Sequence, residues 1–273
     1  MGQGVSKKPR MRAVLGQNLL INRPLVKRLI QNSGINKNDL VVDIGAGSGS
    51  LTAELANIAG KVIAVEIDTN LASKLSSRFI NTENIKVVAC DFKNFDFPSR
   101  DYKVFSNPPF NRSADLLKRL LFSNNPPMAC HLILQQETAR KYAGIGRETA
   151  VSLSLKPWFK FDIVHKFISS DFVPRPRVET VLLKVSKREN PLLSSEESEF
   201  YESFVYYGFS QWKLNLKLAL NKIFSNLQWR HLAEDLGFPL RAKPSELSVE
   251  HWVGLYMFFR DNLQKKHWVI SEG

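Results

Sequence analysis

The sequence predicts an α/β fold with a mainly parallel sheet covered by helices, followed by a small helical domain. Short apolar runs alternate with segments of helical periodicity over most of the first 185 residues. This alternation is expected when parallel strands are joined by crossover helices. The first apolar run ends in closely spaced glycines, and beyond residue 195 helical spacing continues to the end of the chain.

The apolar runs predict five strands in order along the chain, over residues 40–44, 61–67, 85–89, 102–106 and 131–134. Two further strands, 161–168 and 178–185, are expected to close the sheet as a pair. The segment 171–177 between them contains Pro174 and Pro176, which are expected to prevent regular structure there.

Helical spacing places helices between these strands, over residues 23–32, 51–59, 70–80 and 113–122, with a further helix starting at 137–142. Ser113 is expected to cap its helix because a serine side chain can accept a hydrogen bond from a free backbone N–H. In the C-terminal region the same spacing predicts helices over 200–209, 214–225 and 249–259.

The chain is predicted to divide at a polar, proline-containing linker over residues 187–195. Its 273 residues suit one large domain with a small appendage. We therefore expect a basic flexible arm over residues 1–14, the α/β domain over 15–187 and a helical domain over 188–273.

Composition limits the classes of protein to consider. No run approaches about 18 uninterrupted apolar residues, and the basic N-terminus lacks the apolar stretch of a signal peptide. Cys90 and Cys130 are the only cysteines, too few for a disulfide framework or a zinc cluster. The expectation is a cytoplasmic, metal-free protein that does not associate with a membrane.

The net charge of +12 is unevenly distributed along the chain. Residues 1–187 contain 28 Lys or Arg and 15 Asp or Glu, whereas residues 188–273 contain 10 and 11. The basic excess therefore belongs to the predicted α/β domain. Such an excess would attract a polyanion such as RNA or DNA, and the alternative is a solvated, solubilising surface.

The glycine-rich run predicts a cofactor site at the carboxyl edge of the sheet. Gly45, Gly47 and Gly49 follow the first predicted strand, where glycines let the backbone approach a ligand closely. Glu66 ends the second strand and could accept hydrogen bonds from ribose hydroxyls. Asp91 ends the third strand and could accept one from an adenine amine, with Phe92 beside the ring.

The glycine run has two other interpretations. A dinucleotide-binding loop usually has the spacing Gly-x-Gly-x-x-Gly, but this run has Gly-x-Gly-x-Gly. That difference favours S-adenosylmethionine, which has no pyrophosphate to place on a helix N-terminus. The second alternative is that the glycines are required only for a tight turn. The carboxylates at the next two strand ends make this interpretation less favourable.

The tetrapeptide Asn107-Pro108-Pro109-Phe110, at the end of the fourth strand, predicts a site that methylates an exocyclic base amine. The side-chain carbonyl of Asn107 and the backbone carbonyl of Pro108 could accept hydrogen bonds from the amine and free its lone pair. The prolines stiffen the turn and preorganise these acceptors. Phe110 offers a face for stacking, and Phe172 could close on the base from the other side.

This assignment also has alternatives, because the tetrapeptide could be an ordinary turn and Phe172 a core side chain. If it is correct, alignment with an activated methyl group matters more than a general base. A base inside a duplex cannot reach such a pocket, so the target is expected to be looped out, unpaired or flipped.

Several motifs occur in the order found in one known family. They are Gly16-Gln17-Asn18-Leu19-Leu20, Asp43 to Gly49, Val65-Glu66-Ile67-Asp68, Cys90-Asp91-Phe92, Asn107 to Asn111, and Phe172 to Val178. Together they resemble the erythromycin-resistance (Erm) branch of the ribosomal RNA adenine N6-methyltransferases, whose housekeeping branch dimethylates adenines of small-subunit rRNA. The resemblance covers residues 14–187 well and the helical region more weakly.

The resemblance implies a Rossmann-like catalytic domain that binds S-adenosylmethionine, and a C-terminal domain that contributes to RNA binding. It implies that the cofactor is contacted by Asn18, Leu20, Gly45, Gly47, Glu66, Ile67, Asp91, Phe92 and Asn107. Phe110 and Phe172 would sandwich the target base beside Asn107. The implied activity is methylation of a 23S rRNA adenine by a monomer before the 50S subunit is complete, which blocks macrolide, lincosamide and streptogramin B binding.

The chain departs from the family at Pro108, where Ile or Leu is usual. Asn-Pro-Pro-Phe or Asn-Pro-Pro-Tyr is common in enzymes that methylate guanine N2 or DNA adenine. Three alternatives therefore accompany the Erm-like hypothesis. They are an rRNA methyltransferase of another base that protects against a different drug, the housekeeping 16S rRNA adenine dimethyltransferase, and a non-catalytic RNA-binding assembly factor.

Overall fold

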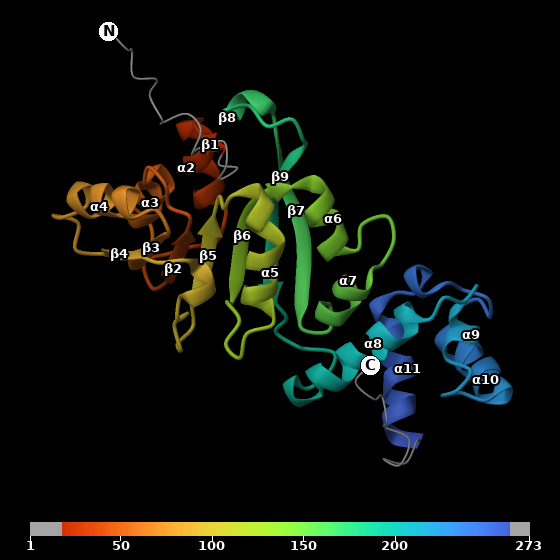
Figure 1. The fold of residues 1–273 in the computed structure, drawn as a ribbon. Helices are drawn as coiled ribbons and strands as arrows, with labels where there is room; N and C mark the ends of the chain where they lie inside the picture. Colours follow the sequence, from red (N-terminus) through yellow and green to blue (C-terminus); the bar gives the residue numbers. More distant parts are fainter. Residues whose placement is uncertain (1–17, 263–273) are drawn as a thin grey trace, which may run out of the picture. The chain divides into compact units, whose positions relative to one another are not determined.

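The computed structural model describes residues 18–262 (Figure 1). The predicted basic arm at 1–14 and the first two residues of the Gly16–Leu20 motif lie outside this range. Within it the chain forms two compact units. The first contains residues 18–139 and 161–187, and the second contains 140–160 and 188–262. The segment 140–160, which the sequence placed inside the α/β domain, thus packs with the C-terminal helices.

A seven-stranded, mainly parallel sheet forms the first unit, as predicted. Its order is β4 (Ile85–Ala89), β3 (Lys61–Glu66), β2 (Leu40–Ile44), β5 (Lys103–Ser106), β6 (Ala129–Gln135), β9 (Thr180–Lys187) and β7 (Phe159–Phe167). The first five strands run parallel, and β9 is antiparallel to β6. The order reverses between β2 and β5, the place where open α/β sheets bind ligands.

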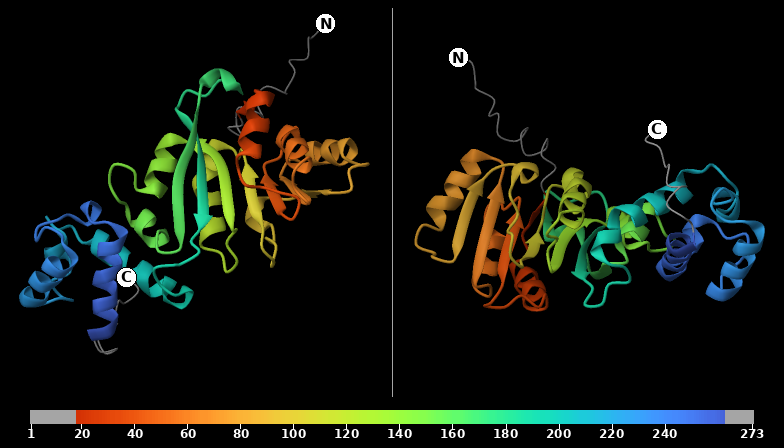
Figure 2. Two further views of the ribbon diagram at one scale, coloured as in Figure 1. Left: turned by 180° about the vertical axis from the view of Figure 1, so that it is seen from behind. Right: turned by 90° about the horizontal axis from the view of Figure 1, so that it is seen from below.

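Helices cover both sides of this sheet (Figure 2). They are α2 (Arg23–Gln31), α3 (Ser50–Ala56), α4 (Thr69–Arg78), α5 (Ser113–Leu121) and α6 (Gln136–Ala143). Helix α2 illustrates why they form where they do. Asn22 caps its first turn by accepting a hydrogen bond from Leu25 N at 3.2 Å, and Leu25, Val26, Leu29 and Ile30 bury one face.

Two local expectations in the first unit need correction. Phe172–Val173 form a short strand, β8, which pairs antiparallel with β1 (Leu19–Leu20). The prolines do not prevent this pairing because the first of them, Pro174, follows β8. Ser113 is the first residue of α5 rather than its cap, because a 3₁₀ turn over Phe110–Arg112 leads directly into the helix.

The second unit is helical and has its own apolar core. Its helices are α7 (Ala150–Leu155), α8 (Ser198–Ser210), α9 (Leu216–Ala219), α10 (Asn226–Leu236) and α11 (Val249–Asn262). The single helix predicted over 214–225 is wrong, since only α9 is helical there and α10 starts afterwards. Ser225 caps α10 in a reciprocal pair with Gln228, which sets this start. No helix between residues 18 and 262 is long and apolar enough to cross a membrane.

Candidate active site

The glycine loop that follows β2 connects two neighbouring strand ends. Ile44 lies opposite Val65 of β3, and Gly45 N donates a hydrogen bond to Val65 O at 2.8 Å. The backbone of Gly45 has a φ of +74°, a conformation that favours glycine. A side chain there would also meet Pro109 Cδ at 3.4 Å. The loop therefore packs directly against the Asn-Pro-Pro-Phe turn.

Glu66 holds this loop in place from the end of β3. Its side chain is 1% exposed. One carboxylate oxygen accepts a hydrogen bond from Gly47 N at 2.8 Å, and the other accepts one from Asp68 N at 3.0 Å. Because each oxygen can accept a second bond, the carboxylate retains capacity for the hydroxyl groups of a ligand.

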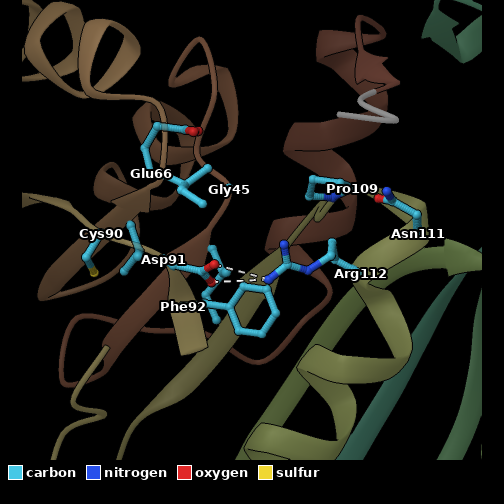
Figure 3. A pocket seen from close by; sticks show the side chains of 11 residues that line it. Gly45, Glu66, Cys90, Asp91, Phe92, Pro109, Asn111 and Arg112 are labelled. Atoms are coloured by element: carbon cyan, nitrogen blue, oxygen red, sulfur yellow. Dashed lines mark hydrogen bonds and ion pairs between the residues drawn. The ribbon is translucent and has the colours of Figure 1, made fainter. Parts of the chain in front are cut away.

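A cavity of about 80 Å³ opens at these strand ends. It is lined by residues that include Gly45, Glu66, Ile67, Asp91 and Phe92 (Figure 3), and we call it the Glu66 cavity. The structure thus brings together five of the predicted cofactor residues, from three strand ends. The carboxyl ends of three parallel strands lie at the same edge of the sheet, which explains why residues at or just beyond these ends are grouped.

Arg112 is a residue of this cavity that the sequence interpretation missed. Its guanidinium forms an ion pair with Asp91 at 3.2 Å and lies 5.0 Å from the centre of the Phe92 ring (Figure 3). A hydrogen bond from Lys93 N, with further stabilisation from Arg112, lowers the pKa of Asp91 below its usual value. The only sequence signal for Arg112 was its place two residues after the tetrapeptide.

A second cavity, of about 50 Å³, lies on the other side of the glycine loop. Its lining includes Asn18, Leu20, Asp43, Gly45 and Asn107, and we call it the Asn107 cavity. Gly45 lines both cavities, so the two are neighbours. Asn18 and Leu20, expected near the methionine part of the cofactor, therefore lie in the same cavity as Asn107, expected near its reactive methyl group.

Asn107 has one satisfied and one unsatisfied polar group in this cavity. Its side-chain N–H donates to the backbone oxygen of Asn18 at 2.8 Å, which fixes the orientation of the amide. Its side-chain oxygen Oδ1 is buried and has no hydrogen-bond partner among the described residues. A buried acceptor without a partner is costly, and a ligand that donates an N–H would satisfy it.

Asp43, at the base of the same cavity, is a buried carboxyl group that the sequence singled out only as the start of the glycine motif. It accepts a hydrogen bond from the Thr52 hydroxyl at 2.7 Å. Burial raises the pKa of Asp43 to about 7, and the nearby charge of Glu66 contributes to the rise. The cavity thus contains a carboxyl group that titrates near neutral pH.

Phe110 and Phe172 lie against each other. Their ring centres are 6.5 Å apart with an angle of 74° between the planes, and Phe172 also contacts Phe167 edge-on at 5.3 Å. Stacked bases are separated by about 3.4 Å, so two parallel rings must be about 7 Å apart to hold a base between them. Both rings are buried, and Phe172 belongs to the apolar core, which was the alternative to a role in base binding. The two rings must therefore rotate before a base can lie between them.

The two cavities fit S-adenosylmethionine by the chemistry of their lining. The Glu66 cavity offers carboxylates and an aromatic ring to an adenosine. The Asn107 cavity offers an unpaired acceptor at the end expected for the reacting group. Within residues 18–262, no group of three or more His, Cys, Asp and Glu side chains is arranged to hold a metal ion.

Comparison with known proteins agrees with this fit. The 23S rRNA methyltransferase ErmE superposes with a TM-score of 0.81 at 26% identity, over 89% of this chain and 100% of that one. An rRNA adenine N-6-methyltransferase of Bacteroides fragilis is 32% identical over 89% of this chain and 91% of the relative. The ribosomal RNA small subunit methyltransferase A of Alkaliphilus oremlandii is 28% identical over 76% of each chain.

The fold and the site define the class as S-adenosylmethionine-dependent methyltransferases built on a Rossmann-like sheet. The model of one family, the ribosomal RNA adenine dimethylases, matches residues 9–259, and this chain belongs to that family. The protein is an rRNA adenine N6-methyltransferase, and its methyl donor is S-adenosylmethionine.

Proposed function

We propose that the substrate is an adenine of 23S rRNA and that its N6-methylation protects the ribosome from macrolide-type antibiotics. The likeness to the 23S enzyme ErmE over the whole length of that chain supports the choice of 23S rRNA. We further propose that the enzyme acts in the cytoplasm as a monomer, before the 50S subunit is complete.

The observation that carries the mechanism is the unpaired side-chain oxygen of Asn107. The N6 nitrogen of adenine is a poor nucleophile because its lone pair is delocalised into the ring. When Asn107 Oδ1 and the backbone oxygen of Pro108 accept its two N–H groups, the nitrogen moves towards tetrahedral geometry and the lone pair becomes available. Since Asn18 and the prolines already fix these acceptors, little reorganisation is needed.

The remaining residues bind and align the reactants. S-adenosylmethionine supplies an activated methyl group on a sulfonium, so the reaction does not need a general base. Glu66 holds the ribose, Asp91 and Phe92 hold the adenine, and Asn18, Leu20 and Gly45 hold the methionine part. Gly47 and Ile67 complete the proposed cofactor site. Phe110 and Phe172 hold the target base, and the displaced proton passes to water.

Mass spectrometry of nucleosides tests the substrate. 23S and 16S rRNA are purified from cells with and without the protein. New N6-methyladenosine or N6,N6-dimethyladenosine in 23S rRNA, with a raised inhibitory concentration of a macrolide, is the expected result. A new mark confined to 16S rRNA would contradict the 23S assignment.

The same assay tests the mechanism through Asn107→Ala. We expect methyl transfer to fall by at least about 100-fold, the size of effect seen when one preorganised transition-state hydrogen bond is removed. Asn81→Ala, at an exposed asparagine beyond α4, is the matched control and should retain full activity. Full activity in Asn107→Ala would exclude the acceptor mechanism.

The housekeeping activity on small-subunit rRNA is the second candidate. Its support is the 28% identity to a small-subunit methyltransferase over 76% of both chains. It predicts activity on assembling 30S particles, whereas the 23S proposal predicts activity on protein-free 23S rRNA. The two substrates, supplied side by side with labelled S-adenosylmethionine, separate the candidates.

A further inference from the structure

A third cavity, of about 340 Å³, lies apart from the two cavities of the active site. Helix α2 contributes Arg28, and the end of β7 contributes His165 and Lys166. Asn22 and Asp171 complete its polar lining. We call it the basic pocket. It is larger than either of the other two cavities, and none of the residue roles proposed above uses it.

Asp171 is the only acidic side chain that lines the basic pocket, and both of its carboxylate oxygens already accept hydrogen bonds. One oxygen of Asp171 accepts a hydrogen bond from the Asn22 side chain at 2.8 Å, and the other accepts one from Ile168 N at 3.1 Å. The Asn22 side-chain oxygen in turn accepts from Leu25 N. These bonds connect the start of α2 to the turn before β8, and Asp171 forms no ion pair with Arg28 or Lys166.

The cationic side chains of the pocket have no such partners. Across residues 18–262, neither Arg28 nor Lys166 forms a side-chain hydrogen bond or an ion pair, and both are exposed. His165 packs edge-on against Phe167 at 4.7 Å between ring centres. Partial burial and the charge of Arg28 lower the pKa of His165. Among the described residues, the pocket is thus a concave surface lined by two cations that form no ion pair and by one carboxylate that is held by neutral donors.

The sequence around α2 extends this charge. Residues 1–38 contain eight Lys or Arg and no Asp or Glu. Two of these, Arg23 and Lys27, lie with Arg28 on the exposed side of α2. A stretch of sequence of this length with basic residues and no acidic residue favours a polyanion over a small neutral ligand as the binding partner.

We propose that the basic pocket binds the phosphodiester backbone of the substrate RNA, at a nucleotide flanking the target adenine. Arg28 offers a planar set of donors that suits two phosphate oxygens, and Lys166 adds a point charge. We place this nucleotide next to the target adenine because Asp171 of the basic pocket immediately precedes Phe172, which is proposed to bind the target base. This inference rests on the proposed RNA-modifying function and adds a binding site to it.

The test compares a pocket variant with a control of equal charge. Arg28→Ala/Lys166→Ala removes two cations of the basic pocket. Lys74→Ala/Lys86→Ala removes two exposed cations from α4 and β4, at the opposite edge of the sheet. Arg28→Lys keeps the charge but loses the planar donor set. The probe is protein-free 23S rRNA, and its affinity is measured over a series of KCl concentrations.

We expect the pocket variant to bind this RNA about tenfold more weakly at moderate salt. The slope of log affinity against log [KCl] should become shallower by about 0.7 for each phosphate of a single strand that the variant no longer neutralises. The KM for RNA should rise while kcat at saturating RNA stays unchanged, since phosphate binding of this kind stabilises ground and transition states alike. Arg28→Lys should keep the wild-type slope with a smaller loss of affinity.

The proposal is overturned if the pocket variant and the control have the same affinity and the same salt slope. It is also overturned if the pocket variant loses affinity for S-adenosylhomocysteine, because that would indicate damage to the fold. Failure of the proposed function gives a different result, namely a wild-type protein that leaves no adenine mark on 23S rRNA. The binding measurements still report on the pocket in that case.

Discussion

Asp43 and Glu66 are neighbouring buried carboxyl groups with different hydrogen-bond surroundings. Glu66 accepts backbone N–H groups at both of its oxygens. Asp43 accepts a hydroxyl from Thr52, and burial raises its pKa to about 7. Glu66 therefore stabilises the glycine loop, whereas Asp43 destabilises the folded protein whenever it is ionised.

We expect Asp43→Asn to raise the free energy of unfolding more at pH 8 than at pH 4. The unfolded pKa of Asp is about 3.9. Because folding raises it to about 7, the stability linked to this proton is present below about pH 4 and is lost as the pH rises towards 7. Because the pKa differs by about three between the two states, the effect of the substitution can differ between pH 4 and pH 8 by at most about 4 kcal/mol.

Urea denaturation of both proteins at the two pH values measures this effect. Taking the difference between Asp43→Asn and the wild type removes the contributions of all other titrating groups. The same difference at pH 4 and pH 8 would contradict the prediction, because it would show that folding does not shift the pKa of Asp43.

Glu66→Gln tests the proposed role of Glu66 in holding the cofactor. A glutamine has one acceptor oxygen, so its NH₂ group must face either Gly47 N or Asp68 N, both of which are donors. We expect the Kd for S-adenosylhomocysteine to rise by about 10- to 100-fold, the cost of losing charge-assisted hydrogen bonds. Isothermal titration calorimetry measures the Kd, with Glu54→Gln on α3 as the control. Unchanged affinity would remove Glu66 from the cofactor site.

At the level of elements, the third glycine of the loop serves packing rather than ligand binding. Gly49 has a φ of +76° and precedes α3. A Cβ there would lie 2.5 Å from Leu75 Cδ2 and 2.8 Å from Phe79 Cε2. The glycine thus lets the start of α3 approach the side chains of α4, whereas Gly45 lets the loop approach Pro109.

We expect Gly49→Ala to lower the free energy of unfolding by about 2–5 kcal/mol. The left-handed backbone costs about 1–2 kcal/mol for a residue with a side chain, and overpacking adds about 1–3 kcal/mol. Gly34→Ala is a matched control, since Gly34 has a φ of +77° and a Cβ at that position would meet no described atom within 4 Å. Urea denaturation should show a clearly smaller loss for Gly34→Ala, and equal losses would indicate that crowding is absent.

The strands could be predicted more accurately than the helices of the second unit. Strand β2 is buried throughout and is followed by glycines, and β3, β4 and β5 end at or close to Glu66, Asp91 and Asn107, so their apolar runs have clear ends. Helix α10 was missed because the apolar spacing continues from α9 through Leu220 and Phe224, both buried in the same core. Only the capping pair at Ser225 marks the break between the two helices, and its signal is short and local.

At the level of the whole molecule, the Glu66 cavity and the Asn107 cavity, which we propose bind the cofactor, belong to the first unit alone. Lining residues of both the Glu66 cavity and the Asn107 cavity lie between residues 18 and 112. The second unit has a separate core that includes Trp229 and Trp252. Ligand binding should therefore stabilise one unit directly and the other only if they unfold together.

We expect S-adenosylhomocysteine at about 100 times its Kd to stabilise the first unit by about 2.7 kcal/mol. For a unit of this size the corresponding rise in Tm is about 5–10 °C. Differential scanning calorimetry should show this rise in one transition and no change in the other. A single transition that moves as a whole would show that the two units unfold cooperatively.

The sequence by itself determined which residues gather at the proposed cofactor site. Gly45, Glu66 and Asp91 each lie at or just beyond a strand end, and the carboxyl ends of parallel strands share one edge of the sheet, so local order along the chain was enough. The same reasoning placed the Asn-Pro-Pro-Phe turn beside them.

Only the tertiary structure decided how these residues are paired. The amide of Asn107 is oriented by Asn18, 89 residues away, and Asp91 is paired with Arg112 from the turn after β5. The basic pocket joins α2 to β7 and to Asp171, 149 residues from its partner Asn22. The assignment of residues 140–160 to the helical unit has the same origin. Contacts of this kind depend on packing between distant segments, which periodicity and motif spacing do not encode.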